Sequence, residues 1–108
     1  METGNIYRVP DRFTSREPEF FETMCRGKQM RIERIISSGH TTEPGNWYEQ
    51  ALSEWVVLLR GKASLEFEHG RMVHLSEGDY LLIPAGQRHR VAFTTTRPEC
   101  IWLAVHFD

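Results

Sequence analysis

Long apolar runs are missing from this sequence of 108 residues. The longest runs, such as Trp55 to Leu59, are far shorter than the run of about 20 residues that a membrane-spanning helix needs. The segment from Met1 to Asn5 lacks the basic and apolar regions of a secretory signal peptide. We therefore expect a cytoplasmic protein without a membrane partner.

An excess of one charge sign is also missing, and so is a cysteine motif. Lys and Arg number 13 and Asp and Glu number 15, which gives a formal net charge of −2 at pH 7. Nucleic acids are bound by dense basic patches, so this balance predicts no nucleic-acid partner. Cys25 and Cys100 lie far apart without a C-x-x-C pair, which favours two reduced thiols over a disulfide.

Three motifs of common enzyme classes do not occur. The chain has no Gly-rich phosphate loop, no G-x-S-x-G nucleophile elbow and no H-E-x-x-H zinc motif. Helical periodicity is absent as well. The chemistry of this chain therefore has to be sought on strands and loops.

Short apolar segments separated by turn residues make up most of the chain. In the segment 62–68, for example, Ala63, Leu65 and Phe67 alternate with polar residues, which is typical of a strand with one buried face. The predicted strands are 20–25, 29–36, 54–59, 62–68, 71–75, 79–83, 89–93 and 99–107. This spacing predicts one all-β domain, either a sandwich or a barrel.

The first residues differ from the rest in having little periodicity. Pro10 and Pro18 punctuate a mixed polar segment, so residues 1–18 are predicted to form an irregular arm over the β-domain. The domain itself is predicted to span residues 19–108. A chain of this length is large enough for one hydrophobic core but too small for two.

The stretch from Gly78 to His89 reads as a strand, a tight turn and a second strand. Pro84 ends the first strand because it cannot donate to a central ladder, and Gly86 lets the backbone reverse. In the strand that follows, His89, Val91 and Phe93 fall on one face. An imidazole on such an apolar face calls for a polar partner.

The spacing G-x5-P-x-G-x2-H in this stretch resembles the second conserved motif of the cupin superfamily, whose histidine binds a metal inside a small β-barrel. The family continues with an asparagine where this chain has Phe93. The resemblance implies an all-β, single-domain jelly-roll barrel (a double-stranded β-helix). An immunoglobulin-like sandwich is the alternative from the strand count, but it does not account for the motif.

The other motif of that family, G-x5-H-x-H-x3–4-E-x6-G, is only half present. Glu54 is followed after six residues by Gly61, as in the pattern. Counting back three residues from Glu54 places Tyr48 and Gln50 where the family has its two histidines, and counting back four places Trp47 and Glu49 there. The resemblance therefore retains Glu54 and His89 of four expected ligands.

The resemblance implies a divalent metal ion (Fe, Mn, Ni or Zn) held by Glu54 and His89. Gln50 could add a carbonyl oxygen, and His106 an imidazole if the face that it shares with Trp102 turns inward. The alternatives stay open: His89 as a core histidine hydrogen-bonded to Glu54 or Tyr48, Glu54 as a solvated strand-end carboxylate, and His106 as a half-exposed residue near the C-terminus.

Two functions follow from these residues. The first is a metal-dependent dioxygenase, isomerase or lyase acting on a small polar or carboxylated molecule, with Tyr48 as proton donor and Trp47, Gln50 and Phe93 lining the ligand site. The second is a metal-free barrel that binds a small molecule without catalysis. A structural barrel with a vestigial pocket is a third possibility.

Two predicted strands are apolar on both faces. In 54–59, an inward Glu54 leaves Trp55, Val57 and Leu59 outside, and the segment 101–105 has the same pattern. A large exposed apolar patch is rare on a monomer, so either the N-terminal arm or a second copy must cover these faces. We expect a homodimer.

Overall fold

The computed structural model describes residues 1–13 and 19–108. Its elements are β1 (Phe20–Gly27), β2 (Met30–Ser37), β3 (Ser53–Arg60), β4 (Ala63–Phe67), the 3₁₀ turn η1 (Glu68–Gly70), β5 (Met72–Leu75), β6 (Tyr80–Ile83), β7 (His89–Thr94) and β8 (Cys100–Phe107). The predicted all-β class is confirmed. The described residues include no helix with the length and apolar character needed to cross a membrane.

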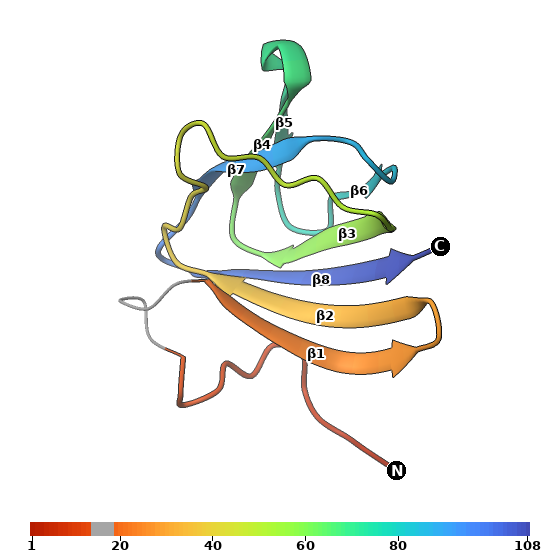
Figure 1. Cartoon of the computed structure of the whole chain (residues 1–108). Helices are drawn as coiled ribbons and strands as arrows, with labels where there is room; N and C mark the ends of the chain where they lie inside the picture. Colours follow the sequence, from red (N-terminus) through yellow and green to blue (C-terminus); the bar gives the residue numbers. More distant parts are fainter. Residues whose placement is uncertain (14–18) are drawn as a thin grey trace.

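The strands form two antiparallel sheets that face each other (Figure 1). The five-stranded sheet has the order β1-β2-β8-β3-β6, and the three-stranded sheet has the order β5-β4-β7. Strands far apart in the sequence are neighbours, so β8 at the C-terminus lies between β2 and β3. The last strand to be synthesised therefore joins the two halves of the larger sheet.

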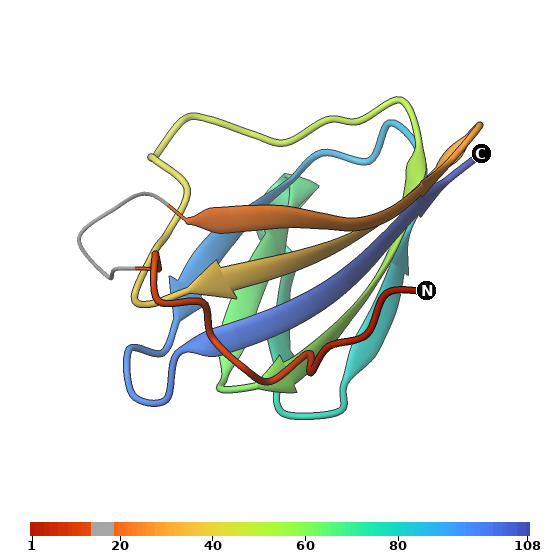
Figure 2. The same cartoon turned by 90° about the horizontal axis from the view of Figure 1, so that it is seen from below.

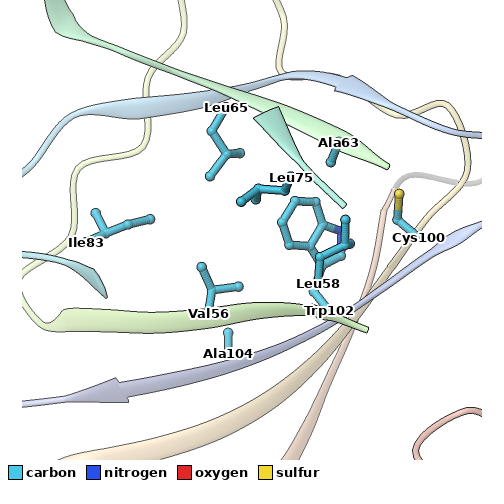
Figure 3. Packing of buried hydrophobic residues seen from close by; sticks show 9 residues of the cluster. All are labelled: Val56, Leu58, Ala63, Leu65, Leu75, Ile83, Cys100, Trp102 and Ala104. Atoms are coloured by element: carbon cyan, nitrogen blue, oxygen red, sulfur yellow. The ribbon is translucent and has the colours of Figure 1, made fainter. Parts of the chain in front are cut away.

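The core lies between the two sheets. On β3, Glu54, Val56 and Leu58 are buried and alternate with partly exposed residues, so the predicted inward face of this strand is correct. Packing side by side in this core are Val56, Leu58, Ala63, Leu65, Leu75, Ile83, Cys100, Trp102 and Ala104 (Figure 3). Trp102 is anchored by its indole N–H, which donates to Ser37 Oγ at 3.2 Å.

The prediction that Phe93 shares the inward face with His89 and Val91 is wrong. Phe93 pairs with Ser64 and Val91 pairs with Leu65, so Ala92 has no partner on β4 and forms a bulge. The extra residue reverses the alternation beyond it. Phe93 is consequently half exposed, and Thr94 takes the buried position.

The N-terminal segment crosses the outer side of the five-stranded sheet (Figure 2). Arg34, on β2, donates to the backbone carbonyls of Asn5, Ile6 and Arg8 at 3.4, 3.2 and 3.0 Å and pairs with Glu22. Residues 1–13 contain neither helix nor strand, as expected for the arm. The predicted boundary between arm and domain, at residues 18 and 19, falls beside 14–18, which lie outside the described residues.

An apolar patch covers the outer face of β6, β3 and β8. The cross-strand pairing aligns two rows, which we call the outer apolar patch: Leu82, Trp55 and Val105, and Tyr80, Val57 and Leu103. Tyr80 is 66% exposed and Leu82 is 57% exposed. The arm does not remove these two side chains from solvent, so the homodimer stays a prediction that this patch supports.

We expect the chain to sediment as a dimer, and Leu82→Asp to weaken that dimer at least about tenfold, because a buried unpaired charge costs more than about 1.4 kcal/mol. Analytical ultracentrifugation over a concentration series measures this. Met72→Asp is the matched control, since Met72 is 41% exposed and lies on β5, which belongs to the other sheet. A wild-type chain that is monomeric at all concentrations would contradict the prediction.

Candidate functional site

A cavity with a volume of about 70 Å³ lies between the two sheets. Its apolar wall includes Val56, Leu65, Ile83 and Trp102. Its polar lining consists of Glu19, Glu33, Tyr48, Gln50, Glu54, His89 and His106. The space is sufficient for a few water molecules or for one small polar group of a ligand.

The structure brings together five of the residues singled out from the sequence. Tyr48, Gln50, Glu54, His89 and His106 all line the cavity. The expectation of a half-exposed His106 is wrong, because this side chain is only 2% exposed. Their roles as ligands or catalysts stay predictions.

Trp47 and Phe93 do not line this cavity. Phe93 points away from it because of the bulge at Ala92. Trp47 lies instead in a neighbouring depression, and Arg88, which does not line that depression, stacks its guanidinium over the Trp47 ring at 5.5 Å. Of the two aromatic residues expected to shape the ligand site, only Trp47 is therefore near it.

Glu54 and His89 face each other across the cavity from opposite sheets. Glu54 stands near the start of β3 and His89 begins β7, and the distance between Glu54 Oε1 and His89 Nε2 is 3.8 Å. This distance is too long for a hydrogen bond, so the interpretation of His89 as a histidine bonded to Glu54 does not hold. Both side chains are more than nine-tenths buried.

The backbone around His89 fixes the orientation of its ring. His89 and Tyr48 exchange two backbone hydrogen bonds of 2.7 and 3.0 Å, and their rings stack with centroids 5.7 Å apart. His89 Nδ1 lies 3.1 Å from the carbonyl oxygen of Gln87, which can only accept. Nδ1 therefore carries the proton, and Nε2 presents its lone pair on the side of Glu54.

Burial changes the acidity of Glu54 and Tyr48. Loss of solvent raises the pKa of the Glu54 carboxyl above its ordinary value, and the positive charges that His106 and His89 carry when protonated oppose this rise. Burial likewise raises the pKa of the Tyr48 phenol. At neutral pH the phenol is therefore a proton donor, and the carboxylate is more basic than one in water.

Glu33 is a site residue that the sequence did not reveal. It forms a second pair with His106, whose Nε2 lies 3.4 Å from Glu33 Oε1. The predicted strand 29–36 has Ile32, Ile35 and Ile36 on both faces, so its inward face could not be assigned. The pairing of β2 with β8 shows which face is inward, because Glu33 lies opposite Ala104, which is buried.

Glu19, the other missed residue, stands at the mouth of the cavity. Its Oε2 accepts a hydrogen bond of 2.5 Å from Ser37 Oγ, and Ser37 in turn accepts from Trp102. Burial raises the pKa of Glu19. No motif marks this residue, because it precedes β1 and reaches the cavity only through the fold.

A wider depression adjoins the cavity and shares Glu19, Phe21 and Tyr48 with it. Its volume is about 580 Å³. The remaining lining comes from the loop before β3 and consists of His40, Thr41, Thr42, Glu43, Asn46 and Trp47. We call it the outer depression, and the two spaces together could hold a ligand larger than the cavity alone.

The side chains expected to hold a metal do not converge. Among residues 1–13 and 19–108, no three His, Cys, Asp or Glu side chains are placed to hold a metal ion. Tyr48 and Gln50 replace two imidazoles, and Nε2 of His106 is directed to Glu33 instead of the Glu54 and His89 pair. The set Gln50, Glu54, His89 and His106 thus surrounds one cavity without fitting a metal centre.

From the raised pKa of Glu54 we predict how the stability of the fold depends on pH. Its stabilising contribution is complete below the ordinary pKa of 4.5 and is lost as the pH rises through the higher folded-state value. Glu54→Gln should therefore raise Tm at pH 7.5 by several degrees, since about 1 kcal/mol corresponds to roughly 4–8 °C in a small domain. The gain should vanish at pH 4.

Calorimetry at the two pH values measures this difference. The exposed Glu68 on η1 offers the control Glu68→Gln, which removes the same charge outside both spaces. A Glu54→Gln variant that is less stable than wild type at pH 7.5 would contradict the prediction.

Comparisons with known proteins agree with this architecture. A family model described as the cupin domain matches residues 35–106. A solved structure from Ralstonia eutropha JMP134, described as a "putative mannose-6-phosphate isomerase", is 37% identical, with a TM-score of 0.89 over 100% of this chain and 99% of that chain. The comparison with curated proteins gave no match.

More distant structures share the fold alone. A cupin superfamily protein from Desulfitobacterium hafniense DCB-2 is 17% identical, with a TM-score of 0.70 over 82% of this chain and 76% of its own. The EutQ protein of Clostridium difficile is 14% identical, with a TM-score of 0.69 over 90% of this chain and 75% of its own. The two facing sheets are thus the jelly-roll barrel expected from the motif at Gly78 to His89, and the chain belongs to the cupin family.

Proposed function

We propose that this cupin binds a small polar molecule in its interior cavity and that Glu54 and His89 move a proton to or from that molecule. The observation that carries the proposal is the pair itself: a buried carboxylate of raised pKa lies 3.8 Å from an imidazole nitrogen whose ring is fixed by Gln87. Paired titratable groups with such environments are typical of acid and base catalysts.

Each residue has a defined part in this reaction. The Glu54 carboxylate takes a proton from a carbon next to a carbonyl group, because a base works best when its pKa approaches the operating pH. The Tyr48 phenol donates to the carbonyl oxygen as negative charge develops there. His89 Nε2, which lacks a proton in the neutral ring, accepts one from a hydroxyl on the carbon that lost its proton. Glu54 then returns its proton to the former carbonyl carbon and His89 returns its proton to the former carbonyl oxygen, while Tyr48 keeps its own proton and only donates a hydrogen bond. The carbonyl group has then moved by one carbon, which is an isomerisation.

The similar protein from Ralstonia eutropha is named as an isomerase of a sugar phosphate. For this chain we propose the same type of reaction, an isomerisation, but not the same substrate. A phosphate needs Lys, Arg or a cluster of backbone N–H groups, and no described Lys or Arg lines either the cavity or the outer depression. The substrate we propose is accordingly not phosphorylated.

Proton transfer is tested with hydroxyacetone as the probe, dissolved in D₂O with the protein and followed by proton NMR. We expect wild type to exchange the protons next to the carbonyl, and Glu54→Gln and His89→Gln to lose about a hundredfold in rate, the lower range for removing a general base. Glu68→Gln should exchange like wild type. Equal exchange rates in all four proteins would contradict the proposed proton transfer. They would favour the alternative function, a barrel that binds a small molecule without catalysis.

The metal-dependent alternative has a separate test. We expect protein purified without chelators to contain far less than one equivalent of Fe, Mn, Ni or Zn, and Tm to stay unchanged when these ions are added, because the donors do not converge. Elemental analysis and calorimetry measure both. About one equivalent of metal that disappears in His89→Ala would instead favour a metal-dependent enzyme.

A further inference from the structure

The polar atoms on the cavity wall are mostly hydrogen-bond acceptors. His89 Nδ1 donates to Gln87, so its Nε2 is an acceptor, and it faces the Glu54 carboxylate, which also accepts. His106 Nε2 lies against the Glu33 carboxylate, so this nitrogen carries the proton and Nδ1 is left with the lone pair. A ligand in this space must therefore bring donors.

One of these acceptors has no partner in the described part of the chain. His106 Nδ1 is buried without a hydrogen bond, on a side chain that is 2% exposed and lines the cavity. Leaving such an atom unpaired is unfavourable, because it has lost its hydrogen bonds to water and gained none in return. A donor group on a ligand would satisfy this nitrogen. The unpaired atom therefore indicates a ligand site, and this indication does not depend on the charges around the cavity.

The charge around the cavity is negative when its two histidines, His89 and His106, are neutral. Three carboxylates, Glu19, Glu33 and Glu54, line it without a described Lys or Arg. Arg31 pairs with Glu33 at 3.7 Å, and among the charged groups that change the pKa of Glu54 it has the smallest effect. The pKa of Glu19 is affected by Ser37, His40 and Glu33, and by no described Lys or Arg. Glu43 adds a further carboxylate in the outer depression.

The rings at the entrance suit the same kind of ligand. Phe21 and Tyr48 line both spaces, and Trp47 lines the outer depression. The ring faces of such residues attract cations, and the guanidinium of Arg88 already stacks on Trp47 in this way. An ammonium group in the outer depression would meet these aromatic rings together with the carboxylates of Glu43 and Glu19, and it would meet Glu33 and Glu54 in the cavity.

We propose that this site selects a small organic cation, whose primary ammonium group enters the cavity and donates to His106 Nδ1, which leaves the Glu54 carboxylate free to act as the base, and that Glu19 at the mouth sets this selectivity by repelling anions. An ammonium group supplies three donors and no acceptor, which matches the wall. The inference rests on the proposed ligand site, and of the small polar or carboxylated ligand expected from the sequence it keeps the polar ligand, with a positive charge, and drops the carboxylated one.

Three tryptophans allow ligand binding to be detected separately at three places in the protein. Trp102 lines the cavity, Trp47 lines the outer depression, and Trp55 packs on Tyr80 on the outer face of β3, away from both. Their indole N–H signals in a ¹H–¹⁵N spectrum, assigned with single Trp→Phe variants, report on each place separately. Propylammonium, 1-propanol and propionate are titrated at pH 8 and constant ionic strength, because they have similar shapes and differ in charge.

We expect propylammonium to shift the Trp102 and Trp47 signals with saturation while the Trp55 signal stays in place. The affinity for 1-propanol should be at least about tenfold lower, and propionate should give no saturable shift, because one buried charge interaction contributes more than about 1.4 kcal/mol. Glu19→Gln should weaken propylammonium binding about tenfold and leave 1-propanol unchanged. Glu68→Gln, with the same loss of charge, should bind like wild type.

The outcomes separate this inference from the proposed function. If 1-propanol or propionate binds at Trp102 as tightly as propylammonium, the cation selectivity is wrong and the cavity remains a ligand site. Equal binding in Glu19→Gln and wild type overturns the role of Glu19. If none of the three shifts Trp102 while hydroxyacetone exchange is intact, the inference fails and the proposed function stands. Loss of both would remove the cavity as a site.

Discussion

The position of β8 between β2 and β3 is the constraint on which the site depends. Its register places His106 beside Glu54 on one neighbour and Ala104 beside Glu33 on the other. The pleat then turns Trp102, Ala104 and His106 to the same inner face, so one strand supplies both the core ring and a site imidazole. A shift of one residue in this register would move all three to the outside and leave two carboxylates without a neighbouring imidazole.

Core and site share one interior, and this explains the acidity of the site residues. Val56, Leu65 and Ile83 belong to the hydrophobic core and also line the cavity, so Glu54 is buried by the same side chains that stabilise the fold. Burial of a carboxyl disfavours its charged form. The protein tolerates this cost where a raised pKa would serve the proposed proton transfer, and such opposition between stability and activity is common in functional sites.

The sequence predicted the fold and part of the site. The jelly-roll barrel was predicted from the turn residues Pro84 and Gly86 and from the interval between Glu54 and Gly61. The same pattern placed Glu54 and His89 inside the barrel. Phe93 was placed on the wrong face, because a bulge depends on the pairing of two strands and leaves no mark in one of them. Glu19 and Glu33 were missed for a related reason: each reaches the cavity through contacts with residues far along the chain.

Arg34 holds the N-terminal segment through three backbone carbonyl oxygens and uses none of that segment's side chains for these bonds. Every residue type carries such an oxygen, so substitutions at Asn5, Ile6 or Arg8 leave the acceptors in place. The segment can therefore diverge in sequence among relatives while its path over the sheet is retained. The guanidinium on β2 thus adds to the docking of this segment a contribution that does not depend on the side chains at these three positions.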